Sequence, residues 1–97
     1  MVEIIYYQEA KKEIKEAAAY YEEHQKGLGQ SFLLSIEYAV KILSSNPLLY
    51  RKLRGRFRRC LVEKIPYGII YTIDKNKIYI VAVMHLKRSP GYWIKRT

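Results

Sequence analysis

The spacing of the hydrophobic residues changes at Pro47, and this change constrains the fold more than any other feature of the sequence. From about Gln8 to Pro47, hydrophobic residues recur every three or four positions, as they do on one face of an amphipathic helix. After it, they form short runs rich in Ile, Val and Tyr, which are typical of strands. A chain of 97 residues suffices for one domain with a small core. We therefore expect residues 1–97 to form a single α+β domain.

The first half predicts a strand followed by two helices. Residues 2–7 are rich in β-branched and aromatic side chains, as strands are. One helix is predicted from about Gln8 to His24, and a second between the glycines at 27 and 29 and the Ser-Ser-Asn-Pro sequence at 44–47. So few residues join the two helices that they must run antiparallel as a hairpin. The glutamates of this half are interpreted as a solvated helix face.

The second half predicts three strands, at residues 57–64, 67–73 and 78–85. The last of these is apolar on both faces, which indicates a central strand covered on both sides. Short connections make the three strands antiparallel neighbours, and with the N-terminal strand they complete one sheet. We expect the helical hairpin to cover one face of this sheet, and the other face to carry the arginines and lysines as a concave basic surface.

Charge is divided unevenly between the two halves. Residues 1–48 have a net charge of −2, whereas residues 49–97 have a net charge of +11. Seven basic side chains lie between residues 51 and 64, opposed there only by Glu63. So much like charge on a small folded surface costs self-repulsion, which is tolerated when a polyanion or an acidic protein binds. We therefore expect the functional surface in the second half.

Several features indicate a cytoplasmic protein without a cofactor. Cys60 is the only cysteine, so no disulfide framework exists. The N-terminus has Glu3 and Glu9 within a short apolar stretch, unlike a signal peptide, and no segment approaches the ~18 apolar residues of a membrane span. Acidic and histidine residues in the second half lack the spacing of metal ligands. We expect no membrane, metal or cofactor binding.

The C-terminal residues 85–96 hold the densest mixture of chemically useful groups. They combine the imidazole of His85 with four cations and two aromatic side chains. Aromatic side chains interleaved with cations can stack on bases and neutralise phosphates. We expect Trp93 to pack against the sheet, while Lys87 and Arg88 face outward.

The sequence resembles the RelE/ParE superfamily of bacterial toxins, the toxic halves of type II toxin–antitoxin modules. The resemblance covers nearly the whole chain. In the first half it rests on Ala18-Ala19-Tyr20-Tyr21, Phe32, Ile36-Glu37, Ala39, Leu43 and Asn46-Pro47. In the second half it rests on Arg58-Arg59-Cys60-Leu61-Val62, Pro66-Tyr67-Gly68-Ile69-Ile70-Tyr71, His85, Arg88, Pro90 and Trp93. The resemblance implies a toxin that arrests growth, and an acidic antitoxin that binds it in a hetero-oligomer.

The superfamily contains two mechanisms, and one of them is cleavage of messenger RNA in the ribosomal decoding site. Lys52-Leu53-Arg54-Gly55 looks like the basic element that RNA-cleaving members carry. Such a nuclease would be metal-independent, with a base, an acid and a cation over the phosphate. By type and position its candidate catalytic residues are His85, Arg54, Arg88, Lys52 and Lys64. His85 fits a structural role at the end of a strand equally well.

The other mechanism is poisoning of DNA gyrase, and we favour it slightly. The long helical hairpin and the His-x-x-Arg-x-Pro ending look more like the gyrase-poisoning and plasmid-stabilisation branch. Trp93, if it replaces a catalytic tyrosine, has no acid–base capacity. The alternatives are the endoribonuclease and a non-toxic basic RNA-binding module. The residues expected to contact a target or nucleic acid are Arg51, Arg56, Arg58, Arg59, Lys87, Tyr92, Trp93, Lys95 and Arg96.

Overall fold

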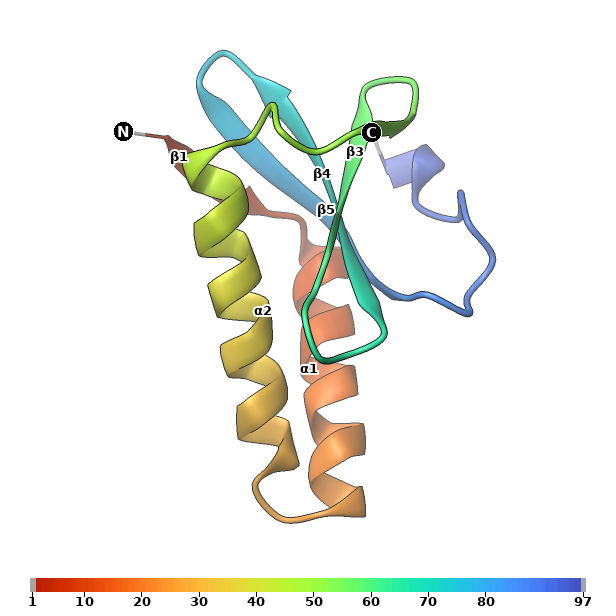
Figure 1. Ribbon diagram of the computed structural model, residues 1–97. Coiled ribbons are helices and arrows are strands. Elements are labelled where there is room, and N and C mark those ends of the chain that lie inside the picture. Colours follow the sequence, from red (N-terminus) through yellow and green to blue (C-terminus); the bar gives the residue numbers. More distant parts are fainter. Residues whose placement is uncertain (1, 97) are drawn as a thin grey trace.

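The elements follow the predicted order of a strand, two helices and a sheet. A computed structural model describes residues 2–96. Its elements are β1 (Glu3–Tyr6), α1 (Gln8–His24), α2 (Leu28–Ser45), β2 (Lys52–Arg54), β3 (Phe57–Leu61), β4 (Tyr67–Asp74), β5 (Lys77–His85) and the short 3-10 helix η1 (Ile94–Arg96). Figure 1 shows α1 and α2 side by side as a hairpin. The predicted α+β class and both helices are confirmed. Within residues 2–96, no helix has the length and apolar character needed to cross a membrane.

The five strands form one mixed sheet in the order β1-β5-β4-β3-β2. β3, β4 and β5 are antiparallel neighbours, as predicted. β5 lies between β1 and β4 and is buried on both faces, which confirms a central strand. The pairing of the N-terminal strand was left open, and β1 pairs in parallel with β5. One feature differs from the prediction: β2 adds a fourth strand to the second half. The three residues of β2 are exposed, so the strand comes from pairing with β3 and not from a hydrophobic pattern.

Different elements cover the two faces of the sheet. On one face, Phe32, Ile36 and Leu43 of α2 pack with side chains of α1, β3, β4 and β5 in the larger core. On the other face lies a smaller core, made of Phe57, Ile70, Val81, Ala82, Met84 and Trp93. The residues after β5, 86–96, form the C-terminal segment that closes this second core (Figure 1). The C-terminal segment therefore covers part of the face that was expected to carry the basic residues, because the apolar side chains there need burial of their own.

A carboxylate of α1 caps the start of α2. Gly27, with φ of 92°, precedes the helix and has no side chain that could act as a cap. The Glu22 carboxylate accepts hydrogen bonds from the backbone N–H of Gly27, at 3.1 Å to each oxygen, and of Gly29, at 3.0 Å. A negative charge is also favourable at a helix N-terminus. Glu22 therefore fixes the hairpin, which corrects its interpretation as only a solvated residue.

The two helices approach each other closely at Gly29. A methyl group there would lie 2.7 Å from the Ala18 carbonyl oxygen and 3.0 Å from Cβ of Glu22. Because backbone cannot yield without separating the helices, we expect Gly29→Ala to lower the free energy of unfolding by about 2 kcal/mol, as overpacking does. Urea denaturation measures this loss. Gln30→Ala, at an exposed neighbouring position, should change stability by less than ~0.5 kcal/mol. Equal stabilities of the two variants would contradict the close approach.

Candidate functional site

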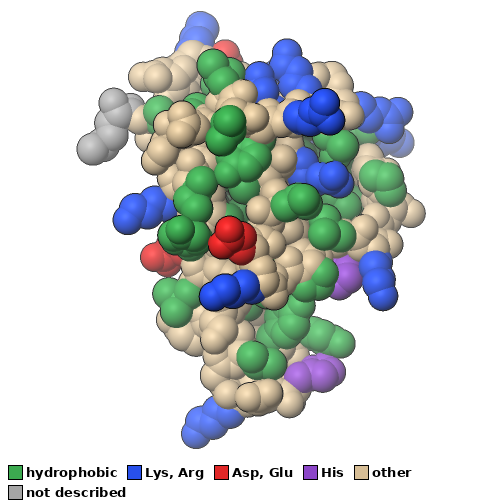
Figure 2. Space-filling view, viewed as in Figure 1, with side chains coloured by type: hydrophobic (Ala, Val, Ile, Leu, Met, Phe, Trp, Pro, Cys, Tyr) green, Lys and Arg blue, Asp and Glu red, His purple; other side chains and the backbone are tan. Residues whose placement is uncertain are grey.

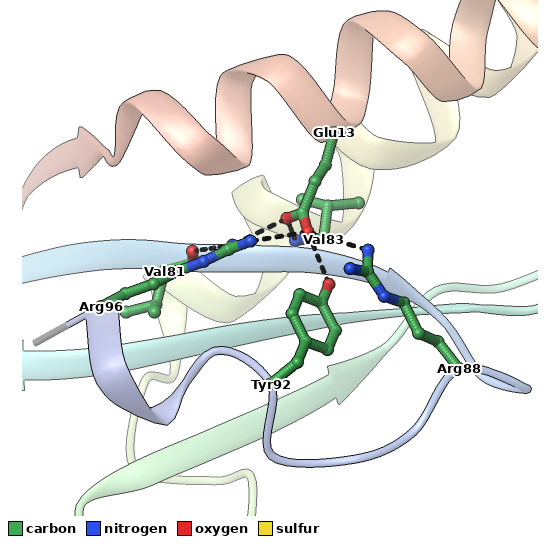
Figure 3. Close-up of polar contacts among 6 residues, drawn as sticks. All are labelled: Glu13, Val81, Val83, Arg88, Tyr92 and Arg96. Carbon is green, nitrogen blue, oxygen red and sulfur yellow. Dashed lines mark hydrogen bonds and ion pairs between the residues drawn. The ribbon is translucent and has the colours of Figure 1, made fainter.

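A network of polar contacts ties the C-terminal segment to α1. The Glu13 carboxylate accepts two hydrogen bonds from the Arg96 guanidinium, one at each oxygen and both at 3.0 Å, and a third from the Tyr92 hydroxyl at 2.6 Å. Arg88 lies 3.5 Å from the same carboxylate. We call Glu13, Arg88, Tyr92 and Arg96 the Glu13 clamp (Figure 3). The Glu13 side chain is only 12% exposed, so its charge depends on these partners.

The Glu13 clamp also completes the edge of β5. β1 ends at Tyr6, opposite Ile80, whereas β5 continues to His85. Past that point, the Val83 N–H donates to Glu13 at 3.0 Å, and the Val81 carbonyl accepts from Arg96 at 3.0 Å. Buried backbone groups need such partners. Two charged side chains thus satisfy the strand edge where a neighbouring strand is missing.

Tyr92 lies between two cations. The guanidinium carbon of Arg88 is 3.7 Å from the centre of the Tyr92 ring, and that of Arg96 is 5.0 Å away. Both distances permit cation–π attraction. Burial, and then the hydrogen bond to Glu13, raise the pKa of the Tyr92 phenol above its ordinary value. Arg88 remains 54% exposed and is the member of the clamp that a partner can reach.

Four of the predicted contact residues are engaged inside the protein. Trp93 is 1% exposed and packs edge-on against Phe57, with ring centres 4.7 Å apart, which confirms that it packs and removes it from the accessible surface. Tyr92 and Arg96 belong to the Glu13 clamp. Arg58 donates to the Tyr50 carbonyl at 2.7 Å and so holds the segment after α2. All four side chains make contacts within the fold. Trp93 is too deeply buried to reach a partner, so its assignment as a surface contact is corrected, whereas Arg58, Tyr92 and Arg96 are half-buried and their contact role stays a prediction.

The remaining predicted contact residues are accessible. Figure 2 shows Lys and Arg side chains interspersed with hydrophobic ones in the upper part of the view, over the ends of the strands and the segment after α2. Arg59 is half-buried, because its aliphatic stem passes next to Gly68. The exposed members of the predicted set are Arg51, Arg56, Lys87 and Lys95.

The candidate catalytic residues do not come together. His85 lies opposite Tyr67 at one end of β5, with the two ring centres 5.2 Å apart. Arg54 lies on β2, three strands from β5. Following the strand pairing across the sheet, Arg54 is level with Tyr79, which lies six residues before His85 on β5. Strand spacing and rise place the backbones of His85 and Arg54 roughly 20 Å apart. One phosphate cannot contact both side chains.

The other three candidate catalytic residues are also dispersed. Lys64 lies in the connection after β3 with φ of 71° and lines a hollow beside α2. Lys52 lies on the edge strand β2, and Arg88 in the Glu13 clamp. The His85 ring has a structural contact as well, because its Nδ1 accepts the Lys87 N–H at 3.1 Å. Arg54 approaches the C-terminal segment at Gly91, where an added methyl group would lie 3.2 Å from its Nη1.

Glu13 was not among the residues predicted from the sequence, although a signal for it exists. Ala10 and Ala17 are buried and lie three residues before and four residues after Glu13, on the same stripe of α1. An acidic residue on a buried stripe needs a cationic or hydrogen-bonding partner. That partner lies 83 residues away at Arg96, and no local pattern could have identified it.

Comparison with known proteins gives a family match and a structural match. The sequence profile of a family described as "ParE toxin of type II toxin-antitoxin system, parDE" matches residues 4–90. No curated protein matches the sequence. Among solved structures, the chain is similar to one titled "Chromosomal ParDE TA system from P. aeruginosa", with a TM-score of 0.79 and 15% identity. The match covers 90% of this chain and 98% of that one. At this identity the likeness concerns the fold.

Proposed function

Because the chain belongs to the ParE toxin family of type II toxin–antitoxin systems, we propose that it arrests growth by binding DNA gyrase and not by cleaving RNA. Its role as the toxin component of such a module, with an antitoxin as partner, follows from the family. What we propose beyond the family is that the target is gyrase and that the protein acts by binding it. Since the proposed target is cytoplasmic, we also propose that the protein acts there.

The main support for the proposal is that the candidate catalytic residues lie far apart. Metal-free cleavage of RNA requires a base, an acid and a charge-stabilising cation around one phosphate. His85 and Arg54 lie at opposite ends of the sheet and three strands apart. The Tyr92 phenol is a weaker acid than an ordinary tyrosine, because burial and Glu13 raise its pKa. This arrangement supports a binding toxin.

The charge of the molecule supports the same conclusion. The second half has a net charge of +11, and Arg51, Arg56, Lys87 and Lys95 are exposed. Exposed cations attract a negatively charged partner from solution and speed its association. The same charge favours an acidic antitoxin segment, which is disordered alone, folds on binding and pairs its carboxylates with these cations.

Expression of the protein without its antitoxin tests the toxin role. We expect induction to stop growth, because the unopposed protein occupies its target. An otherwise identical gene with a stop codon at Tyr20 should have no effect, and co-expression of the antitoxin should restore growth. The measurement is the number of viable cells after induction, together with the amount of soluble protein. Normal growth with abundant soluble protein would contradict the proposal.

A further inference from the structure

One hollow combines exposed leucines with cations. It has a volume of about 470 Å³ and is lined by Leu49, Tyr50, Arg51, Lys52, Leu53, Arg59 and Leu61, which we call the β2 groove. The residues come from the segment after α2, from the edge strand β2 and from β3. Pockets that bind ligands usually measure roughly 300–1,000 Å³, so the β2 groove is large enough for several side chains of a partner.

The leucines of the β2 groove are unusually accessible. Leu49 is 70% exposed, Leu61 is 55% exposed and Leu53 is 40% exposed. Single exposed leucines are common on protein surfaces, but three that line one hollow form a patch of the kind that marks an interaction site. Covering these side chains would remove apolar surface from water, and this gives a partner part of its binding free energy.

The charges of the β2 groove indicate the chemical character of its partner. Arg51, Lys52 and Arg59 contribute three positive charges, and none of the seven lining residues is acidic. Tyr50 is the only aromatic side chain of the groove, and it is half-buried next to Tyr71, with ring centres 6.5 Å apart. Single-stranded nucleic acids bind through aromatic side chains on which their bases stack. Aliphatic side chains next to cations instead match a peptide that has both apolar and acidic residues.

We propose that the β2 groove is the docking site for an acidic amphipathic peptide segment, whose apolar side chains cover Leu49, Leu53 and Leu61 while its carboxylates pair with Arg51, Lys52 and Arg59. Docking occurs through side chains and not by addition of a strand. β2 has only three residues, and a register shift separates Lys52 from Arg54, which blunts this edge against further strand pairing. The inference rests on the proposed function only in that the antitoxin supplies such a segment.

Two peptides of equal charge test the proposal. The first is a fluorescein-labelled peptide of 14 residues with leucine at every third or fourth position and glutamate elsewhere, and the second has serine in place of leucine. Fluorescence anisotropy gives the affinity of each for the intact protein. We expect the leucine peptide to bind at least about tenfold more tightly, because it covers the exposed leucines. Equal affinities would overturn the proposal, as would tighter binding of a single-stranded RNA of 14 nucleotides.

Matched variants locate the site. Leu53→Ser combined with Leu61→Ser should abolish the preference for the leucine peptide. The control combines Leu34→Ser with Ile42→Ser on α2, where the side chains are 54% and 36% exposed, close to the 40% and 55% of Leu53 and Leu61. This control should keep the preference. Urea denaturation should show that both variants fold, because all four replaced side chains are exposed.

The outcomes distinguish this inference from the proposed function. An equal loss of affinity in the groove variant and its control would mean that the peptide binds elsewhere, and would overturn the docking site. If the two peptides bind alike while the unopposed protein still arrests growth, the docking site is wrong and the proposed function stands. If the leucine peptide selects the β2 groove but expression leaves growth normal, the docking site stands and the toxin role fails.

Discussion

Replacing Glu13 with alanine is expected to lower the free energy of unfolding by about 3 kcal/mol, the cost of breaking a largely buried ion pair. The substitution leaves the Arg96 guanidinium, whose side chain is 15% exposed, without its carboxylate. It also removes the acceptor of the Val83 N–H and of the Tyr92 hydroxyl. Each unpaired buried donor adds a desolvation penalty.

Glu13→Ala should also release the C-terminal segment before the domain unfolds. Trp93 is the only tryptophan, is 1% exposed, and its indole N–H has no hydrogen-bond partner among the described residues. Apolar packing and the Glu13 clamp therefore hold it in place. We expect tryptophan fluorescence of the variant to shift to longer wavelength at temperatures where circular dichroism still shows a folded protein.

A matched substitution on the same helix serves as the control. Glu16 lies on the exposed face of α1, and Glu16→Ala should change the free energy of unfolding by less than ~0.5 kcal/mol. Glu13→Gln keeps hydrogen-bonding groups but loses the charge, so its stability should fall between that of wild type and that of Glu13→Ala. If Glu13→Ala proved as stable as Glu16→Ala, the Glu13 clamp would contribute nothing to stability.

The sequence predicted the elements whose pattern is local. The three- and four-residue spacing of apolar residues sets α1 and α2, and Asn46-Pro47 ends the second helix. The double-sided apolar run 78–85 predicted the central strand correctly. The parallel pairing of β1 with β5 was beyond such reasoning, because it joins Glu3 to Lys77 across most of the chain. β2 was missed because its exposed residues acquire strand geometry only by pairing with β3.

The candidate site was predicted less completely than the fold. Charge counting placed the basic residues in the second half, but it could not separate Arg58, which binds backbone carbonyls, from exposed neighbours such as Arg56. Nearness in sequence suggested that Tyr92 and Arg96 act with Lys87 on one surface. In the structure the first two bind Glu13 of α1, a contact that depends on tertiary packing.

A second large effect is expected on DNA supercoiling, and it tests the mechanism. If the protein acts by binding gyrase, it should inhibit the supercoiling of plasmid DNA by purified gyrase, and the inhibition should increase with its concentration. Raising the salt concentration should weaken this inhibition if the exposed cations contribute to binding. His85→Ala should inhibit as well as wild type does, because the His85 ring contacts Tyr67 and the Lys87 N–H at one end of the sheet and lies apart from Arg54.

The most direct test of a binding toxin compares two activities of one purified preparation. Supercoiling by gyrase and the integrity of messenger RNA on translating ribosomes are measured in parallel, with wild type and His85→Ala. The proposal predicts that both proteins inhibit supercoiling and that neither cleaves the RNA. Cleavage of ribosome-bound messenger RNA by wild type, lost in His85→Ala while its thermal unfolding stays unchanged, and with gyrase unaffected, would contradict it.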